Sequence, residues 1–285
     1  MPLLEARSRQ SAPEPWTLMG RRFVWGERTY VMGIVNVTPD SFSDGGRTAP
    51  EAAIAHAEQL LADGADMLDI GGESTRPGSL PVSADEELAR ILPVIRTLAA
   101  RGIVLSVDTF KPEVAAQALE AGAAIINDIS GLRDPAMLDV AARFGAPVIA
   151  MHMQGTPQTM QDDPRYDDVV SEVHRELEAA VRKARARGVA VMVDPGIGFG
   201  KTQEHNLTLL RHLDRLHVDG CPMLLGTSRK GFIGRLLDLP VDERVEGTMA
   251  TVTLGVSQGV DVVRVHDVKE AVRTVRVADA IARRP

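Results

Sequence analysis

The sequence predicts an α/β protein built as a single (β/α)8 barrel with a short N-terminal β-hairpin, and three observations lead to this prediction. Runs rich in Val, Ile and Leu recur along the 285 residues, as in parallel strands that are buried on both faces. An amphipathic stretch follows each run. Polar residues close the runs, at the strand ends from which a barrel assembles its active site. Without a linker or a break in composition, we expect one domain over residues 16–285, preceded by a mobile segment, residues 1–15.

The individual elements follow from turn residues and from hydrophobic spacing. Residues 16–30 contain Gly20 and Gly26 and predict an antiparallel hairpin that closes the bottom of the barrel. Strands are expected near residues 30–36, 66–70, 103–107, 124–127, 147–151, 190–194, 222–226 and 261–264. Helices are expected near residues 50–63, 85–101, 112–121, 134–144, 165–187, 203–213, 243–258 and 267–283. Pro112 and Pro135 suit the first turns of their helices, and Gly145 suits a helix-to-strand return.

Composition and charge exclude several classes of protein. Lys and Arg number 32 and Asp and Glu number 39, so the net charge of −7 argues against a chain that coats nucleic acid. The sequence has no run of 18 apolar residues, and its polar start does not resemble a signal peptide. The single cysteine, Cys221, has no partner for an internal disulfide, which suits a reducing compartment. We therefore expect a cytoplasmic protein whose partners include neither nucleic acid nor a membrane.

Two strand-to-helix connections are unusually long and overhang the catalytic face of the predicted barrel. The first, VTPDSFSDGGRTAP, follows Asn36, and the second, IGGESTRPGSLPVSADE, follows Asp69. Loops of this length are often lids or binding segments. They carry complementary groups, because the first holds Asp40 and Asp44 and the second holds Arg76. We therefore expect two lid loops that act on one ligand.

The segment DPGIGFGKT, residues 194–202, fits neither common glycine-rich nucleotide motif. The phosphate loop requires Gly where Pro195 stands, and the dinucleotide fingerprint requires Gly where Lys201 stands. The glycines instead indicate a backbone held close to a ligand, with Phe199 as an apolar wall. The alternative is an ordinary tight turn.

Three polar residues that close separate strands predict recognition of a heterocycle. Asp108 and Asp194 are carboxylates, which accept two parallel hydrogen bonds from the N–C–N edge of a purine-like or pterin ring. Asn127 suits the amide side of such a ring. Each of these residues alone could be a buried cap at a strand end. Together with Lys230, they favour a ligand site.

A second cluster predicts an anion site. The segment TSRKG, residues 227–231, follows the seventh strand, where barrels often bind phosphate, and Arg264 and His266 end the eighth. The alternative is a surface cluster of salt bridges. Asn36 ends the adjacent first strand, and its amide oxygen suits Mg2+, which keeps most of its waters and relies on substrate phosphates. A single Cys and the lack of paired His spacing argue against zinc. For His152, structural packing is favoured over catalysis.

Eight motifs in order resemble the dihydropteroate synthase family from about Val31 to the end of the chain. They are NVTPDSFSDGG, DIGGESTRPG, SVDTFKPEVA, INDISG, MHMQGTPQTMQ, DPGIGFGK, GTSRKGFIG and RVHDVKE. The family condenses 6-hydroxymethyl-7,8-dihydropterin pyrophosphate with p-aminobenzoate to give 7,8-dihydropteroate and pyrophosphate. The resemblance implies a folate-pathway transferase with Mg2+ as cofactor. It also implies a sulfonamide target that forms a homodimer.

The resemblance also implies roles for particular residues. Catalysis would rest on Asp108, Asp194, Lys230, Arg264 and His266. The pterin would meet Asp108, Asn127, Met151, Asp194, Phe199, Gly226, Lys230 and Arg264. The diphosphate would meet Asn36, Arg76, Arg264 and His266, with Asn36 also at the metal. The p-aminobenzoate and the lid loops would involve Phe42, Asp44, Thr75, Arg76, Pro77, Phe199 and Gly231.

One position departs from the family pattern. Many members have Ser after the lysine of SRK, near the p-aminobenzoate carboxylate, and this chain has Gly231. The departure puts the usual carboxylate contact and sulfonamide response in question. Two alternatives to a synthase are a barrel enzyme that transfers a methyl group from methyltetrahydrofolate and a catalytically silent paralogue. The paired lid loops and the anion site argue against the first alternative, and the intact set of polar site residues argues against the second.

Overall fold

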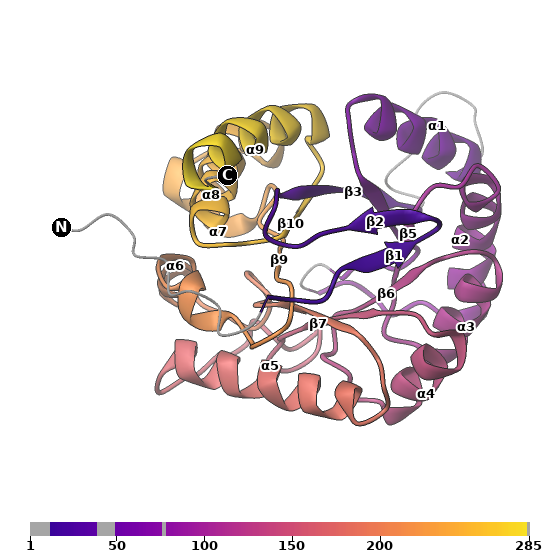
Figure 1. Ribbon diagram of the computed structural model, residues 1–285. Helices are drawn as coiled ribbons and strands as arrows, with labels where there is room; N and C mark the ends of the chain where they lie inside the picture. Colours follow the sequence, from indigo (N-terminus) through magenta and orange to yellow (C-terminus); the bar gives the residue numbers. More distant parts are fainter. Residues whose placement is uncertain (1–11, 39–48, 76–77, 284–285) are drawn as a thin grey trace.

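The computed structural model describes residues 12–38, 49–75 and 78–283, and over these residues the chain forms the predicted barrel. Eight parallel strands are hydrogen-bonded in the order β8-β7-β6-β5-β4-β3-β10-β9, and a bridge between Val193 and Met223 closes the ring. The helices lie around the outside of the strands (Figure 1). The strands are β3 (Tyr30–Asn36), β4 (Met67–Gly71), β5 (Leu105–Asp108), β6 (Ile125–Asp128), β7 (Val148–Met151), β8 (Val191–Asp194), β9 (Leu224–Leu225) and β10 (Val262–Val265).

Most of the helices begin and end where the sequence predicts. They are α1 (Ala49–Ala62), α2 (Ala84–Ala99), α3 (Pro112–Glu120), α4 (Pro135–Phe144), α5 (Val169–Arg185), α6 (Gln203–Arg211), α7 (Gly231–Leu237), α8 (Val245–Ser257) and α9 (Val268–Ala282). Pro112 and Pro135 lie in the first turns of α3 and α4, as predicted. Asp134 caps α4 by accepting from Ala136 N at 2.9 Å, and Gly145 ends the helix with a φ of 63°.

Helix α7 is absent from the sequence prediction. Its seven residues, GFIGRLL, include two glycines, which lower helix propensity. Gly234 leaves room for the Arg244 guanidinium, which lies where a Cβ would be and donates to Leu239 O and Arg229 O. Tertiary contact therefore selects a helix that local preference does not indicate.

The N-terminal hairpin closes the bottom of the barrel, as predicted. It consists of β1 (Trp16–Leu18) and β2 (Arg21–Phe23), which pair antiparallel and lie across the middle of the ring of helices in Figure 1. Its side chains pack against the lowest inward-facing residue of each strand. This cluster comprises Trp16, Leu18, Phe23, Trp25, Tyr30, Met32, Met67, Val104, Ile125, Ile149, Met192, Leu224 and Val262.

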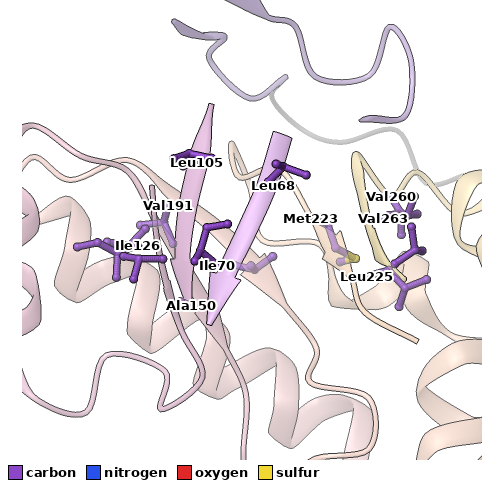
Figure 2. Packing of buried hydrophobic residues seen from close by; sticks show 14 of the residues in the cluster. Leu68, Ile70, Leu105, Ile126, Ala150, Val191, Met223, Leu225, Val260 and Val263 are labelled. Atoms are coloured by element: carbon purple, nitrogen blue, oxygen red, sulfur yellow. The ribbon is translucent and has the colours of Figure 1, made fainter. Parts of the chain in front are cut away.

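The barrel interior changes from apolar to polar within two residues along four strands. Successive side chains of a strand point to opposite faces, so the residue two positions after each of these apolar residues also points inward. These pairs are Met67 and Asp69, Ile125 and Asn127, Met192 and Asp194, and Val262 and Arg264. The residues between them, such as Leu68, Ile126 and Val263, pack in the hydrophobic cluster that also contains residues of the helices (Figure 2). The alternation places a polar layer directly above an apolar floor.

Within residues 12–38, 49–75 and 78–283, no helix combines the length and the apolar composition that crossing a membrane requires.

Candidate active site

A buried network joins four strands at the centre of the polar layer. Arg264 donates from Nε to Asp69 Oδ2 at 2.5 Å and from Nη2 to Asp108 Oδ2 at 2.7 Å. Asn127 donates from Nδ2 to the same Asp69 oxygen at 3.0 Å. Two carboxylate oxygens, Asp69 Oδ1 and Asp108 Oδ1, are buried without a hydrogen-bond partner among the described residues. The structure therefore brings Asp108, Asn127 and Arg264 together as predicted, and it leaves acceptor capacity in the same place.

Burial and neighbouring charge shift the pKa values of this network. Burial raises the pKa of Asp108 to about 7, with Arg264 acting to lower it and Asp69 to raise it further. Burial works to lower the pKa of Arg264, but the carboxylates of Asp69 and Asp108 outweigh burial, and the net shift is upward. Arg264 therefore remains a guanidinium, while the charge of Asp108 changes near neutral pH.

Asp194 and Lys230 form the opposite side of the polar layer. Asp194 accepts from Gly196 N at 2.8 Å, and burial raises the pKa of its carboxyl group. The Lys230 ammonium donates to Ile197 O and lies 4.5 Å from the centroid of the Phe199 ring. Burial lowers the pKa of Lys230 to about 8. Both charged groups are thus held in a poorly solvated environment.

The apolar residues predicted for the pterin slot lie beside these groups. Met151 belongs to a small buried cluster with Ile129, against which Phe199 packs. A Cβ added at Gly226 would lie 3.9 Å from Asp194 Oδ2. Glycine therefore keeps the space beside this carboxylate oxygen open, in agreement with the predicted slot.

Lys201 holds the loop that carries Phe199. Its side chain is completely buried, and its Nζ donates to Gly196 O and to Phe199 O, each at 2.9 Å. The same ammonium lies 2.9 Å from His152 Nδ1 on the neighbouring strand-to-helix connection. Burial lowers the pKa of Lys201 to about 7. His152 is thus part of a packed polar contact, which is the role that the sequence favours for it.

Two glycines of this loop are explained by close contacts with protein backbone, which the sequence does not indicate. Gly196, Gly198 and Gly200 all have positive φ values. A Cβ at Gly196 would collide with His152 O, and one at Gly200 would lie 2.5 Å from Gln154 O. These two glycines permit close approach to protein backbone, and the expectation that the loop also lies close to a ligand stays a prediction.

The predicted anion cluster is only partly assembled. His266 Nδ1 lies 2.9 Å from Ser228 Oγ, which also accepts from His266 N at 3.1 Å. Arg229, in contrast, makes two bonds to Asp267, from Nε at 2.9 Å and from Nη2 at 2.5 Å. Arg229 therefore belongs to a salt bridge, the alternative considered for this segment. Asn36 ends β3 beside β10, the strand that carries Arg264.

The base of the second lid loop is anchored by an ion cluster that the sequence did not indicate. Lys111 forms ion pairs with Glu73 and with Glu87, the latter at 2.6 Å. Glu87 is fully buried, and Glu73 lies two residues before Thr75, which is half-buried. The other lid residues predicted for the site lie outside the described residues: Phe42, Asp44, Arg76 and Pro77.

The sequence prediction of the site omits two central residues, Asp69 and Lys201, although the sequence contains a signal for each. Asp69 lies at the end of a hydrophobic run, which is the signal that selected Asp108 and Asp194. Lys201 lies inside the glycine motif and is buried. Their importance depends on contacts with residues far away in sequence, which the sequence pattern does not display.

Comparison with known proteins identifies the class to which this barrel and its polar layer belong. The family model described as "Pterin binding enzyme" matches residues 32–266. Dihydropteroate synthase from Synechocystis is 49% identical over 278 residues, which cover 95% of this chain and 96% of that protein. The chain therefore belongs to the pterin-binding enzymes, in the dihydropteroate synthase family.

Solved structures give the same result. Xanthomonas albilineans dihydropteroate synthase with 4-aminobenzoic acid has a TM-score of 0.89 and 47% sequence identity, covering 96% of this chain and 100% of that one. The same enzyme in complex with 7,8-dihydropteroate has a TM-score of 0.86 and 45% identity, covering 95% and 100%.

Proposed function

We propose that this chain is a dihydropteroate synthase, which joins 6-hydroxymethyl-7,8-dihydropterin pyrophosphate to p-aminobenzoate and releases pyrophosphate. One observation supports this assignment above the others. Asp108, Asn127, Asp194 and Lys230 lie in one layer with Arg264, directly above the apolar floor, and each is buried or half-buried. Such a layer matches a flat heterocycle whose edge carries several donors and acceptors. The family relationship supplies the reaction.

The proposed chemistry is substitution at the methylene carbon of the pterin. The bond from this carbon to the diphosphate oxygen breaks, and the diphosphate leaves with the electron pair. The amine nitrogen of p-aminobenzoate forms the new C–N bond and releases one proton to solvent. Positive charge develops on the pterin in between, and the carboxylates of Asp108 and Asp194 stabilise it. Arg264 and His266 would bind the departing diphosphate.

Binding of p-aminobenzoate is proposed to involve Phe199, Gly231 and the lid loops. Gly231 is the first residue of α7, directly after Lys230. A Cβ at Gly231 would lie 3.3 Å from Arg235 Nη1, so the position is open to a small side chain. The lids are proposed to close once the pterin diphosphate is bound. Binding of p-aminobenzoate to the protein should therefore be weak until pyrophosphate is added, which calorimetry can measure.

Mg2+ is proposed as the cofactor, and the donors at the site fit it. Asn36 ends β3 next to the strand of Arg264. In the described part of the chain, no three His, Cys, Asp or Glu side chains form a cluster that could hold a metal ion. Mg2+ commonly uses one or two protein oxygens together with substrate phosphates, so the single amide of Asn36 suffices. When bound, Mg2+ would neutralise charge on the diphosphate.

We also propose a cytoplasmic homodimer. Cys221 is the single cysteine of the sequence and is buried, which suits a reducing compartment. Exposed apolar side chains lie on α8 and α9, at Leu254, Val277 and Ile281, and offer a surface for a second copy. The glycines of α8 serve packing within the chain, since a Cβ at Gly255 would lie 2.6 Å from Leu225. Sedimentation of the purified protein tests the dimer.

The decisive experiment is an assay of pyrophosphate release with both substrates. The wild-type protein should release pyrophosphate and form 7,8-dihydropteroate only when the pterin diphosphate, p-aminobenzoate and Mg2+ are all present. Methyltetrahydrofolate with a methyl acceptor serves as the comparison reaction. No condensation, or methyl transfer in its place, would overturn the assignment.

A further inference from the structure

Asp69 occupies the centre of the polar layer but is the least accessible of its charged groups. It is completely buried and accepts two hydrogen bonds at one oxygen, Oδ2. The donors, Asn127 and Arg264, come from β6 and β10, on opposite sides of β4. Asp69 therefore links two predicted pterin contacts that share no direct bond.

The bond from Asn127 determines which amide atom is available to a ligand. A carboxylate can only accept hydrogen bonds, so the atom facing Asp69 must be the amide nitrogen. The oxygen of Asn127 then faces away from Asp69, as an acceptor for a ring N–H or an amino group. Without the carboxylate, the amide has no electrostatic reason to keep this orientation.

The bond to Arg264 determines the plane of the guanidinium. Nε is held by Asp69 and Nη2 by Asp108, so two fixed carboxylates hold one rigid, planar group. A guanidinium held in this way keeps its face in one direction, as stacking on a flat ring requires. Losing the Asp69 contact leaves Arg264 attached through Asp108 alone.

We propose that Asp69 is a positioning residue of the pterin slot, which orients the amide of Asn127 and the guanidinium plane of Arg264 without touching the ligand. The inference rests on the proposed function, because the ligand of the slot is taken to be a pterin. It assigns to Asp69 a role in specificity and affinity, in addition to balancing the charge of Arg264.

The test is Asp69→Asn, which preserves shape and removes the charge. The KM for 6-hydroxymethyl-7,8-dihydropterin pyrophosphate should rise and kcat/KM should fall about tenfold, because an amide oxygen in the place of Oδ2 accepts from Asn127 and Arg264 more weakly than a carboxylate does. The KM for p-aminobenzoate should change little. The matched control is Asp66→Asn, three residues earlier, where the carboxylate also pairs with arginines but at the bottom of the barrel. This control should lose stability and keep both KM values.

The pH profile provides a readout that a purely structural role would not change. Asp108 titrates near pH 7, and its charged neighbours include Arg264, Asp69, Glu87, Asp128 and Lys230. Of these, Asp69 raises the pKa of Asp108. In Asp69→Asn the acid limb of kcat/KM should therefore move to lower pH, even though the maximum activity falls. In Asp66→Asn the limb should stay where it is in the wild type.

A reciprocal exchange keeps the proposal testable if Asp69→Asn does not fold. Asn127→Asp alone would place two carboxylates side by side and should weaken pterin binding. The double variant Asp69→Asn, Asn127→Asp removes the repulsion between the two carboxylates and lets the new amide nitrogen at position 69 donate to the new carboxylate at position 127, although a nitrogen in the place of Oδ2 no longer accepts from Arg264 Nε. It should bind the pterin diphosphate more tightly than Asn127→Asp alone in calorimetry.

The two proposals fail in distinguishable ways. If the wild-type protein binds the pterin diphosphate but releases no pyrophosphate, the proposed reaction is wrong. Binding of the pterin diphosphate to the Asp69 variants then still tests the role of Asp69. Asp69→Asn with wild-type KM values and an unshifted acid limb, or no recovery in the double variant, would overturn the role of Asp69.

Discussion

The two ends of the barrel both contain buried carboxylates, and they differ in how completely these are paired. At the bottom, Asp66 Oδ1 accepts from Arg21 and Arg28, and Oδ2 accepts from Arg28 and from Val31 N. At the top, three residues further along the chain, Asp69 uses one oxygen and leaves the other buried without a partner among the described residues. Asp108 does the same.

The difference indicates that the carboxylate at the bottom contributes more to stability than those at the top. A buried polar atom without a partner costs roughly 1–3 kcal/mol, so the two unpaired carboxylate oxygens lower the stability of the upper end. At the bottom, Asp261 accepts from Gly26 N and Met223 N, and aromatic rings fill the remaining space. At the top, burial raises the pKa values of Asp108 and Asp194. The strongest test of this contrast is a pair of mutations, one that changes stability at the bottom and one that changes activity at the top.

Phe23→Ala at the bottom should produce the largest effect on stability. Phe23 is completely buried and lies 5.0 Å from Tyr30 and 6.0 Å from Trp25 between ring centroids. The free energy of unfolding should fall by about 3–5 kcal/mol, as for other buried Phe-to-Ala changes. Denaturant unfolding measures the loss, and kinetics per folded molecule should match the wild type. A changed KM for the pterin substrate would show that the two ends are coupled.

Asp194→Ala at the top should reverse this pattern. It removes an acceptor for ring N–H groups, worth about 1.5–3 kcal/mol, so kcat/KM should fall at least tenfold. Burial raises the pKa of Asp194, which limits what its charge contributes to stability. The variant also leaves Gly196 N without its acceptor, so the melting temperature should fall, but less than in Phe23→Ala. Steady-state kinetics and thermal unfolding measure both quantities. A folded variant with wild-type activity would contradict the site.

Arg264→Met should shift the acid limb of kcat/KM in the direction opposite to the shift expected for Asp69→Asn. Arg264 acts to lower the pKa of Asp108, so its loss should raise this pKa above about 7. The acid limb of kcat/KM should then move to higher pH. A folded pKa above the unfolded value of 3.8 means that the native state binds more protons, so stability falls as pH rises between the two values. Unfolding across the neutral range should show this fall extending further in the variant. If the acid limb of kcat/KM does not shift, the group that titrates there is not Asp108.

His266→Ala should affect the diphosphate selectively. Its ring is held by Ser228, at the rim beyond the Asp69 network. Calorimetry should show binding of the pterin diphosphate weakened about two- to tenfold, and binding of the free hydroxymethyl pterin little changed. Equal losses of affinity for both ligands would show that His266 has a structural role and does not bind the diphosphate.

Gly231→Ser should have the smallest effect, and it tests whether residue 231 contacts the p-aminobenzoate carboxylate. Gly231 has no positive φ, and the nearest atom to an added Cβ is the flexible end of Arg235 at 3.3 Å. Ser should therefore fit without loss of stability. A new hydroxyl could donate to the p-aminobenzoate carboxylate, and the KM for this substrate should fall by about tenfold at most. An unchanged KM would show that residue 231 does not contact the carboxylate.

The sequence by itself determined the barrel, the hairpin at its bottom and most of the polar layer. These features follow from local rules, because hydrophobic runs, turn residues and polar strand ends repeat with fixed spacing. Asp108, Asn127 and Asp194 were identifiable in this way, since each closes a run. The family motifs, which span almost the whole chain, gave the reaction.

Tertiary structure alone decided which of the polar residues are bonded to one another. Asp69 closes a run as Asp108 does, but its role depends on Asn127 and Arg264, which are 58 and 195 positions away. Arg229 and Lys230 are neighbours in one motif, but only Arg229 is neutralised, by Asp267. The closure of the barrel determines these pairings. A one-dimensional pattern records which side chains point inward but not which ones meet, and that distinction separates the site from its supports.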